Sequence, residues 1–312
     1  MWRQGMRFRW HLDLRHPRLR EVWALMWPSV IAGAAVQVNV LVNGAFASSI
    51  DGGRSWLGCA FRLMQFPIGV FGVSIATALL PAVSRHHAQD DRAGFGVRVR
   101  EGLRLAWFFT VPAALGLAVL ARPIIALIYQ HGRFTAHDTE MTALALQAYS
   151  IGLCGYAALK VVVPCFYVLG LPQLPLRVSL LGIAVNLGLN ALLMEVLGLG
   201  HAGLALTTSC IALLNFGQLA WALGRRLDLG RGGEWVSFGA RLFLSSALMG
   251  GAAWGIERLL GPWAAGSFPR AALSLGAAIG GGGVVYFAAS LLLRVEETSQ
   301  AWGMIRRRLL RK

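Results

Sequence analysis

The stretch from Leu63 to Val83 carries no ionisable side chain. In a helix that rises about 1.5 Å per residue, this stretch is long enough to cross a hydrocarbon core about 30 Å thick. Arg62 stands directly before it, and Gln65 and Pro67 follow inside it. A guanidinium near the hydrocarbon costs free energy unless it faces water, a partner or an anion. The stretch therefore predicts a transmembrane helix that begins with either a topological anchor or a site for a negatively charged group.

The composition extends this prediction to the whole chain. Of the 312 residues, 56% are hydrophobic and only 14% are charged, whereas soluble domains are about 25% charged. We expect an all-α polytopic membrane protein with about eight transmembrane helices, at residues 22–47, 60–84, 103–130, 139–169, 174–197, 201–224, 235–259 and 269–293. Pro112 and Arg122-Pro123 interrupt the third segment, so its last part is expected to be a separate piece. Residues 88–104 are expected to lie at the membrane surface as an amphipathic segment.

The charge balance is strongly basic, with 29 Lys and Arg against 14 Asp and Glu and a net charge of +15. In a soluble protein this balance would favour a nucleic-acid partner. Here the basic residues lie between hydrophobic segments, and no soluble block is large enough to bind nucleic acid. We therefore expect no nucleic-acid partner, and we expect these residues to set the topology and to contact anionic membrane lipids.

The distribution of the basic residues predicts the orientation. If the N-terminus is cytoplasmic, most of them fall on the inner side, and an even number of spans places both termini in the cytoplasm. Residues 1–20 then form a basic cytoplasmic segment, and residues 294–312 form a basic cytoplasmic tail with Glu296 and Glu297 solvated. Two cations, Arg62 and Lys160, are not explained by topology.

Lys160 lies about midway along the fourth predicted span, with no acidic residue within one helical turn. An ammonium at that depth must be paired, hydrated or deprotonated. Its partner is expected to be another helix, water, or a ligand that carries phosphate or carboxylate. Arg62 is nearer to the outer end of its span, so it either extends to the membrane surface or belongs to a binding site.

Neutral polar side chains recur at helical spacing. Asn39 and Asn43 are four residues apart on the first span, as are Asn186 and Asn190 on the fifth, and Thr208 lies on the sixth. Such side chains usually form hydrogen bonds between helices. The alternative is a small oxygen-lined site for a cation such as Na⁺, which would be weak without a carboxylate.

No reactive constellation is present in the sequence. The cysteines form no C-x-x-C motif, His86 and His87 are adjacent rather than four residues apart, and no Ser-His-Asp set or phosphate-binding loop occurs. We therefore expect no enzymatic activity, no catalytic residue, no metal site and no cofactor other than Na⁺.

Several segments in order along the chain carry a family resemblance. They are RLMQFP at 62–67, GVFGV at 69–73, LPAVS at 80–84, YQHGRFT at 129–135 and GLAL at 203–206. With these segments the chain resembles the MurJ/MviN lipid II flippase family of the MOP exporter superfamily, over residues 17–293. The resemblance implies a portion equivalent to the family's seventh to fourteenth spans. It divides the chain into one six-helix lobe at residues 21–225 and two additional helices at residues 226–293.

The resemblance also implies site residues. Arg62 and Lys160 match cationic positions that would attract the pyrophosphate of the lipid headgroup. Asn43, Asn186, Asn190 and Thr208 match positions that bind sodium in some members. Phe61 stands where the family usually has an acid, and Asn43 and Asn190 stand where carboxylates can occur.

The function implied by the resemblance is one half of a flippase in the bacterial inner membrane. It would move the undecaprenyl-pyrophosphate-linked peptidoglycan precursor by alternating access, together with an N-lobe on a separate chain. The alternative is a non-transporting or truncated membrane scaffold derived from such a transporter. A six-span partner in the adjacent reading frame would favour the first hypothesis.

Overall fold

The computed structural model describes residues 17–264 and 266–298, and within them every regular element is a helix. The α-helices are α1 (Pro17–Ala47), α2 (Gly53–Pro67), α3 (Ser74–Ala88), α4 (Arg92–Val119), α5 (Ala121–Tyr129), α6 (Ala136–Val168), α7 (Gln173–Asn190), α8 (Gly200–Gly224), α9 (Gly232–Ala264) and α10 (Phe268–Leu292). Two π-helical segments, η2 (Ile68–Val73) and η3 (Ala191–Val196), continue α2 and α7.

Seven helices in the described part of the chain are long and apolar enough to cross a membrane. One of them runs unbroken from Gly53 to Ala88 and so includes α2, η2 and α3. α1, with 31 residues, lies where the first span was expected. The all-α membrane fold is therefore confirmed, and the expected count of about eight agrees with these seven helices and α1.

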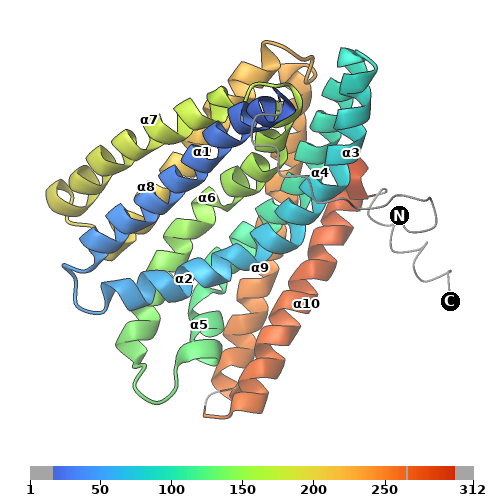
Figure 1. The fold of residues 1–312 in the computed structure, drawn as a ribbon. Coiled ribbons are helices and arrows are strands. Elements are labelled where there is room, and N and C mark those ends of the chain that lie inside the picture. The colour runs from blue at the N-terminus through green and yellow to red at the C-terminus, as the bar shows by residue number, and fades with distance from the viewer. Residues whose placement is uncertain (1–16, 265, 299–312) are drawn as a thin grey trace, which may run out of the picture.

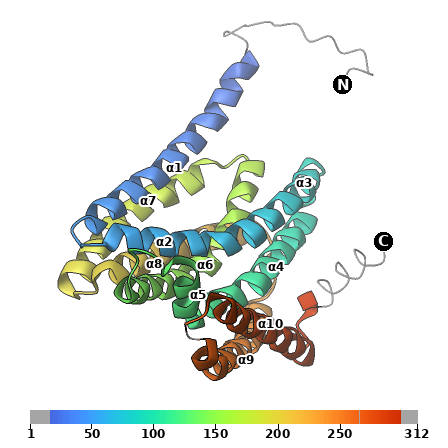
Figure 2. The ribbon, with the colours of Figure 1, turned by 90° about the horizontal axis from the view of Figure 1, so that it is seen from below.

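α6 lies at the centre of the bundle and packs against α2, α4 and α8 (Figure 1). α1 and α7 lie side by side at one flank, as both views show (Figures 1 and 2). α9 and α10 pair with each other at the opposite flank, where α9 packs on α4 and α10 on α5. The proposed division into one lobe and two added helices stays a prediction.

The helix from Gly53 to Ala88 widens at its middle. Pro67 has no backbone N–H to donate, and its ring displaces the carbonyl of the preceding turn. Ile68–Val73 follows as a π-helix, the wider turn by which a helix accommodates such a disturbance. The aromatic ring of Phe71 on η2 stacks on that of Phe109 on α4, with the ring centroids 4.8 Å apart. The widened turn is therefore held against the rest of the bundle.

Residues 88–104, expected to lie at the membrane surface, do not form an element of their own, and their surface location stays a prediction. α4 begins at Arg92, with the Asp91 carboxylate accepting from the Gly94 N–H at 2.8 Å, and runs without a break to Val119. Pro112 does not interrupt it. Proline leaves the carbonyl four residues earlier without its helical donor, and here the Tyr286 hydroxyl of α10 donates to that Phe108 carbonyl. The break expected at Arg122-Pro123 is confirmed, because α5 is a separate helix.

The end of α10 also differs from expectation. Glu297, expected to be solvated, is only 4% exposed. The Arg104 guanidinium on α4 contacts the carboxylates of Glu296, at 3.1 Å, and Glu297. This ion pair fixes the chain after α10 to α4. Most of the basic segments expected at residues 1–20 and 294–312 lies outside the described residues.

Candidate functional site

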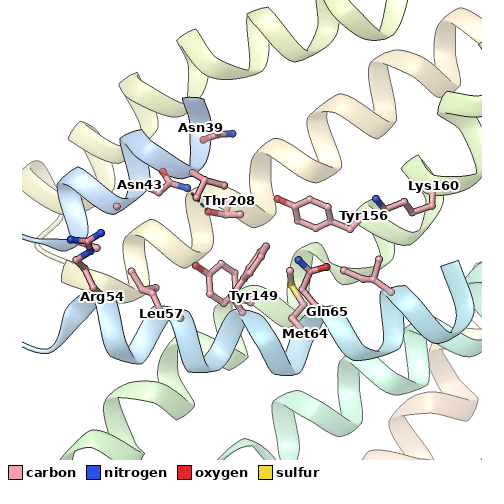
Figure 3. A pocket seen from close by; sticks show the side chains of 16 residues that line it. Asn39, Asn43, Arg54, Leu57, Met64, Gln65, Tyr149, Tyr156, Lys160 and Thr208 are labelled. Atoms are coloured by element: carbon pink, nitrogen blue, oxygen red, sulfur yellow. Dashed lines mark hydrogen bonds between the residues drawn. The ribbon is translucent and has the colours of Figure 1, made fainter. Parts of the chain in front are cut away.

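A cavity of about 340 Å³ lies between α1, α2 and α6, with one residue from α8. Figure 3 shows side chains of α2 along one side of this space and side chains of α1, α8 and α6 along the other, with Tyr149 of α6 close to the α2 side chains. The two sides leave a narrow space with aromatic, amide and cationic groups on its walls. The elements that carry these groups decide what the space can bind.

α2 contributes one continuous face to the cavity. Its lining positions recur at intervals of three and four residues, which is the spacing of a single helical face. They are Arg54, Leu57, Gly58, Phe61, Met64 and Gln65. The ring of Phe61 lies edge-on to Tyr149, with the ring centroids 5.5 Å apart. The middle of this face is therefore apolar.

α6 contributes Tyr149, Tyr156 and Lys160, again on one face. α6 packs closely on the π-helical segment because position 72 is glycine. A β-carbon added at Gly72 would lie 3.3 Å from the Ala157 Cα and 3.6 Å from the Lys160 Cγ. A larger residue at position 72 would therefore displace the helix that carries the lysine.

The cavity has a cation at each end. Figure 3 shows Arg54 at one end and Lys160 at the other, with both tyrosines between them. Neither cation forms an ion pair with any described residue. Each tyrosine adds a hydroxyl to the amide and hydroxyl groups of four other lining residues, Asn39, Asn43, Gln65 and Thr208. The site can therefore accept an anion at either end and an amphipathic group between them.

Arg54 falls between the predicted spans 22–47 and 60–84, so the sequence did not mark it as a site residue. α2 begins at Gly53, seven residues before the span expected at residue 60, so Arg54 lies on the helix. The intervals between Arg54, Leu57, Phe61 and Gln65 could have revealed this, because they continue the helical period upstream.

Arg62 lies outside the cavity lining and is exposed. Eight residues after Arg54, at 100° per residue, its side chain leaves α2 about 80° away from that of Arg54. Arg62 therefore points off the cavity face of α2. Of the two predicted headgroup residues, Lys160 lines the cavity and Arg62 does not, and both roles stay predictions.

The four residues predicted as a cation site do meet. The Asn190 amide donates to the side-chain oxygens of Asn43 at 2.8 Å and of Asn186 at 3.0 Å. The Asn43 amide donates to the Thr208 hydroxyl at 3.1 Å, and this hydroxyl donates to the Leu204 carbonyl at 2.9 Å. Asn186 and Asn190 are fully buried. We call these four side chains, from α1, α7 and α8, the amide clamp.

The amide clamp in this arrangement does not fit a sodium ion. Na⁺ requires several oxygens that point at one centre, and carboxylates strengthen such a site. Here the oxygens of Asn43 and Asn186 both point at an N–H donor of Asn190, and the set contains no carboxylate. The geometry is that of hydrogen bonding between helices. Sodium binding at these residues stays a prediction.

Within the described residues, no group of three or more His, Cys, Asp or Glu side chains could hold a metal ion. The four cysteines are free thiols. The chemistry that the cavity offers is therefore charge, hydrogen bonding and apolar contact, which suit binding of an anionic amphipathic molecule.

A family model described as "Lipid II flippase MurJ" matches residues 1–274 of the chain. The chain belongs to the MurJ family. The "Probable lipid II flippase MurJ" of Vibrio cholerae is 35% identical over 283 residues, which are 90% of this chain and 53% of that protein. The "Lipid II flippase MurJ" of Burkholderia cenocepacia is 33% identical over 239 residues, covering 76% and 46% of the two chains. The chain thus spans about half the length of the curated MurJ relatives it matches.

Solved structures agree on the fold. "Lipid II flippase MurJ, inward closed conformation" superposes with a TM-score of 0.70 at 23% identity, covering 94% of this chain and 58% of that one. An outward-facing MATE family transporter of the MOP superfamily has a TM-score of 0.58 at 16% identity, covering 89% and 66%. The expected MurJ/MOP-type fold is confirmed. The family is named for a transport step, in agreement with the expectation that the chain is not an enzyme.

Proposed function

We propose that this chain is one half of a lipid II flippase, which moves the undecaprenyl-pyrophosphate-linked peptidoglycan precursor across the bacterial inner membrane. The observation that carries the proposal is the elongated cavity with unpaired Arg54 and Lys160 at its ends. Membership of the MurJ family supports the choice of substrate. In a scaffold that binds no anion, the same cavity would cost free energy, because the described residues do not neutralise its two cations.

The substrate's chemistry matches the groups in the cavity. A guanidinium can make two parallel hydrogen bonds to one phosphate, and an ammonium acts as a point charge. Arg54 and Lys160 would therefore hold the pyrophosphate at different stages of transport, and the tyrosines would contact the sugars. Arg62, on the exposed flank of α2, would join them when a second wall closes on that flank.

The second wall is proposed to be an N-lobe supplied by a separate chain. The cavity is formed by α1, α2, α6 and α8 of this chain, and alternating access requires two bodies that move about a site between them. The chain would be a multi-pass inner-membrane protein with both termini in the cytoplasm. Its cytoplasmic basic residues would contact anionic lipids.

The experiment is complementation of a bacterium depleted of its own flippase. The chain would be expressed alone, and together with a six-span N-lobe protein. Growth and the exposure of lipid II on the outer leaflet would be measured. We expect rescue only with the N-lobe, and we expect Lys160→Ala to abolish it because, among the described residues that line the cavity, the ammonium is the one cation at its end.

The matched control is Arg258→Ala, which removes one exposed positive charge stacked over Trp254 and outside the cavity. This variant should rescue as well as the unmodified pair. If Lys160→Ala also rescues fully, the headgroup role of Lys160 is refuted. If the unmodified pair is inserted and helical but never restores lipid II exposure, the scaffold alternative is favoured.

A further inference from the structure

A second cavity, of about 420 Å³, lies at the other end of the bundle. The turn between α3 and α4, the connection between α6 and α7, and the end of α8 all contribute to it. Its floor is apolar, with Phe95 1% exposed and Leu227 6% exposed. The α3–α4 turn and the end of α8 bring charged side chains to its rim. We call it the rim pocket.

Three arginines line the rim pocket: Arg92, Arg225 and Arg226. None of them forms an ion pair with a described residue. Two acids, Asp90 and Asp91, lie among them, and the Asp91 carboxylate also contacts the His86 ring at 2.9 Å and accepts from the Gly94 N–H. The three arginines outnumber the two acids, so the lining of the pocket carries a net positive charge.

The rim pocket lies where the apolar surface of the bundle ends. Trp221, one turn before Arg225 on α8, is 66% exposed. The Arg225 guanidinium lies over its ring at 4.9 Å. An exposed tryptophan beside an arginine is typical of the boundary between hydrocarbon and headgroups. A lipid whose chains lie along Trp221 would place its headgroup at this pocket.

We propose that the rim pocket binds the phosphate of an anionic phospholipid headgroup through Arg92, Arg225 and Arg226. Arginine is suited to this ligand because its planar fork donates two hydrogen bonds to one phosphate. The proposal rests on the membrane placement given above but does not depend on transport, because the rim pocket shares no residue with the candidate cavity. A free phosphate has the same chemistry, and the experiment distinguishes the two sources.

The experiment measures lipid retention by the purified full-length chain in detergent, using native mass spectrometry with added phosphatidylglycerol or phosphatidylcholine. We expect preferential retention of phosphatidylglycerol. Arg225→Gln with Arg226→Gln should weaken it by roughly thirtyfold, since each basic residue near an anionic surface contributes about fivefold. Asp90→Asn should strengthen it, because it removes the competing carboxylate. A matching circular dichroism spectrum would show that each variant is folded.

The matched control is Arg98→Gln, which removes an arginine already paired with Glu101 at 2.7 Å. It should leave retention unchanged. Inorganic phosphate added at constant ionic strength decides the source. Competition with the lipid indicates that the pocket recognises phosphate itself, and no competition indicates that the lipid chains are also required. Equal phosphatidylglycerol retention by the double variant, the control and the unmodified chain would overturn the proposal, whatever the outcome of complementation.

Discussion

Replacing Asn43 by alanine should loosen α1 from the bundle. Its side chain forms hydrogen bonds to Asn190 of α7, at 2.8 Å, and to Thr208 of α8, at 3.1 Å. Hydrogen bonds between membrane helices contribute on average about 0.6 kcal/mol and at most about 1.7 kcal/mol each. Losing both should therefore lower the free energy of unfolding by about 1 to 3 kcal/mol.

The assay is reversible unfolding in mixed micelles with increasing sodium dodecyl sulfate, followed by circular dichroism. A double-mutant cycle of Asn43→Ala and Asn190→Ala isolates the direct hydrogen bond between them, and its coupling energy should be about 0.6 to 1.7 kcal/mol. Gln37→Ala, at an exposed amide on the same helix, is the control and should change little. A coupling energy indistinguishable from zero would refute the amide clamp.

The same assay tests the sodium prediction. If the amide clamp is a neutral set of hydrogen bonds, NaCl and KCl at equal concentration should stabilise the unmodified chain equally. Replacing Asn43 and Asn190 together by aspartate supplies two carboxylates and should make the stability depend on sodium. A sodium-specific gain by the unmodified chain would instead establish a cation site at these residues.

Three further predictions concern the rest of the bundle. Tyr286→Phe should lower the free energy of unfolding by about 1 kcal/mol, since it leaves the Phe108 carbonyl beside Pro112 without a donor. Glu297→Ala should cost about 1 to 3 kcal/mol in the same unfolding assay, because it leaves the partly buried Arg104 with only the exposed Glu296; no loss would refute the ion pair. The N–H of Gly94 and the His86 ring hold the pKa of the Asp91 carboxyl below its usual range. The stability contributed by Asp91 is thus present above the usual carboxyl pKa and lost as the pH falls through its lowered value. A fall in the protection of the Gly94 amide against hydrogen exchange, relative to its intrinsic rate at each pH, that is absent in Asp91→Asn would show this.

The sequence predicted the fold class and three residues that line the cavity, Asn43, Lys160 and Thr208, for clear physical reasons. Long apolar segments have few structural alternatives, so the helices were placed well. Lys160 was recognised because an ammonium with no acid within a turn is costly in mid-membrane. Asn186 and Asn190 were recognised because spacing alone places them on one helical face.

The remainder required contacts that no local pattern contains. Arg54 was missed because its helix begins seven residues before the expected span. Pro112 was expected to break a helix, but the donor that replaces its N–H comes from Tyr286, far along the chain. Glu297 was expected to be solvated because its partner, Arg104, is far away in the sequence. Residue 104 was also expected to lie at the end of a surface segment.

The positions of Arg54 and Lys160 limit how a diphosphate can travel. Arg54 and Gln65 bracket the cavity face of α2, and eleven residues of helix separate them by about 16 Å. Figure 3 shows Lys160 farther from Arg54 than Gln65 is, and a diphosphate is much shorter than this stretch of helix, so it would contact one of the two cations at a time. The cargo would have to be passed from one charge to the other, and the uncharged tyrosines between them line the stretch that it crosses.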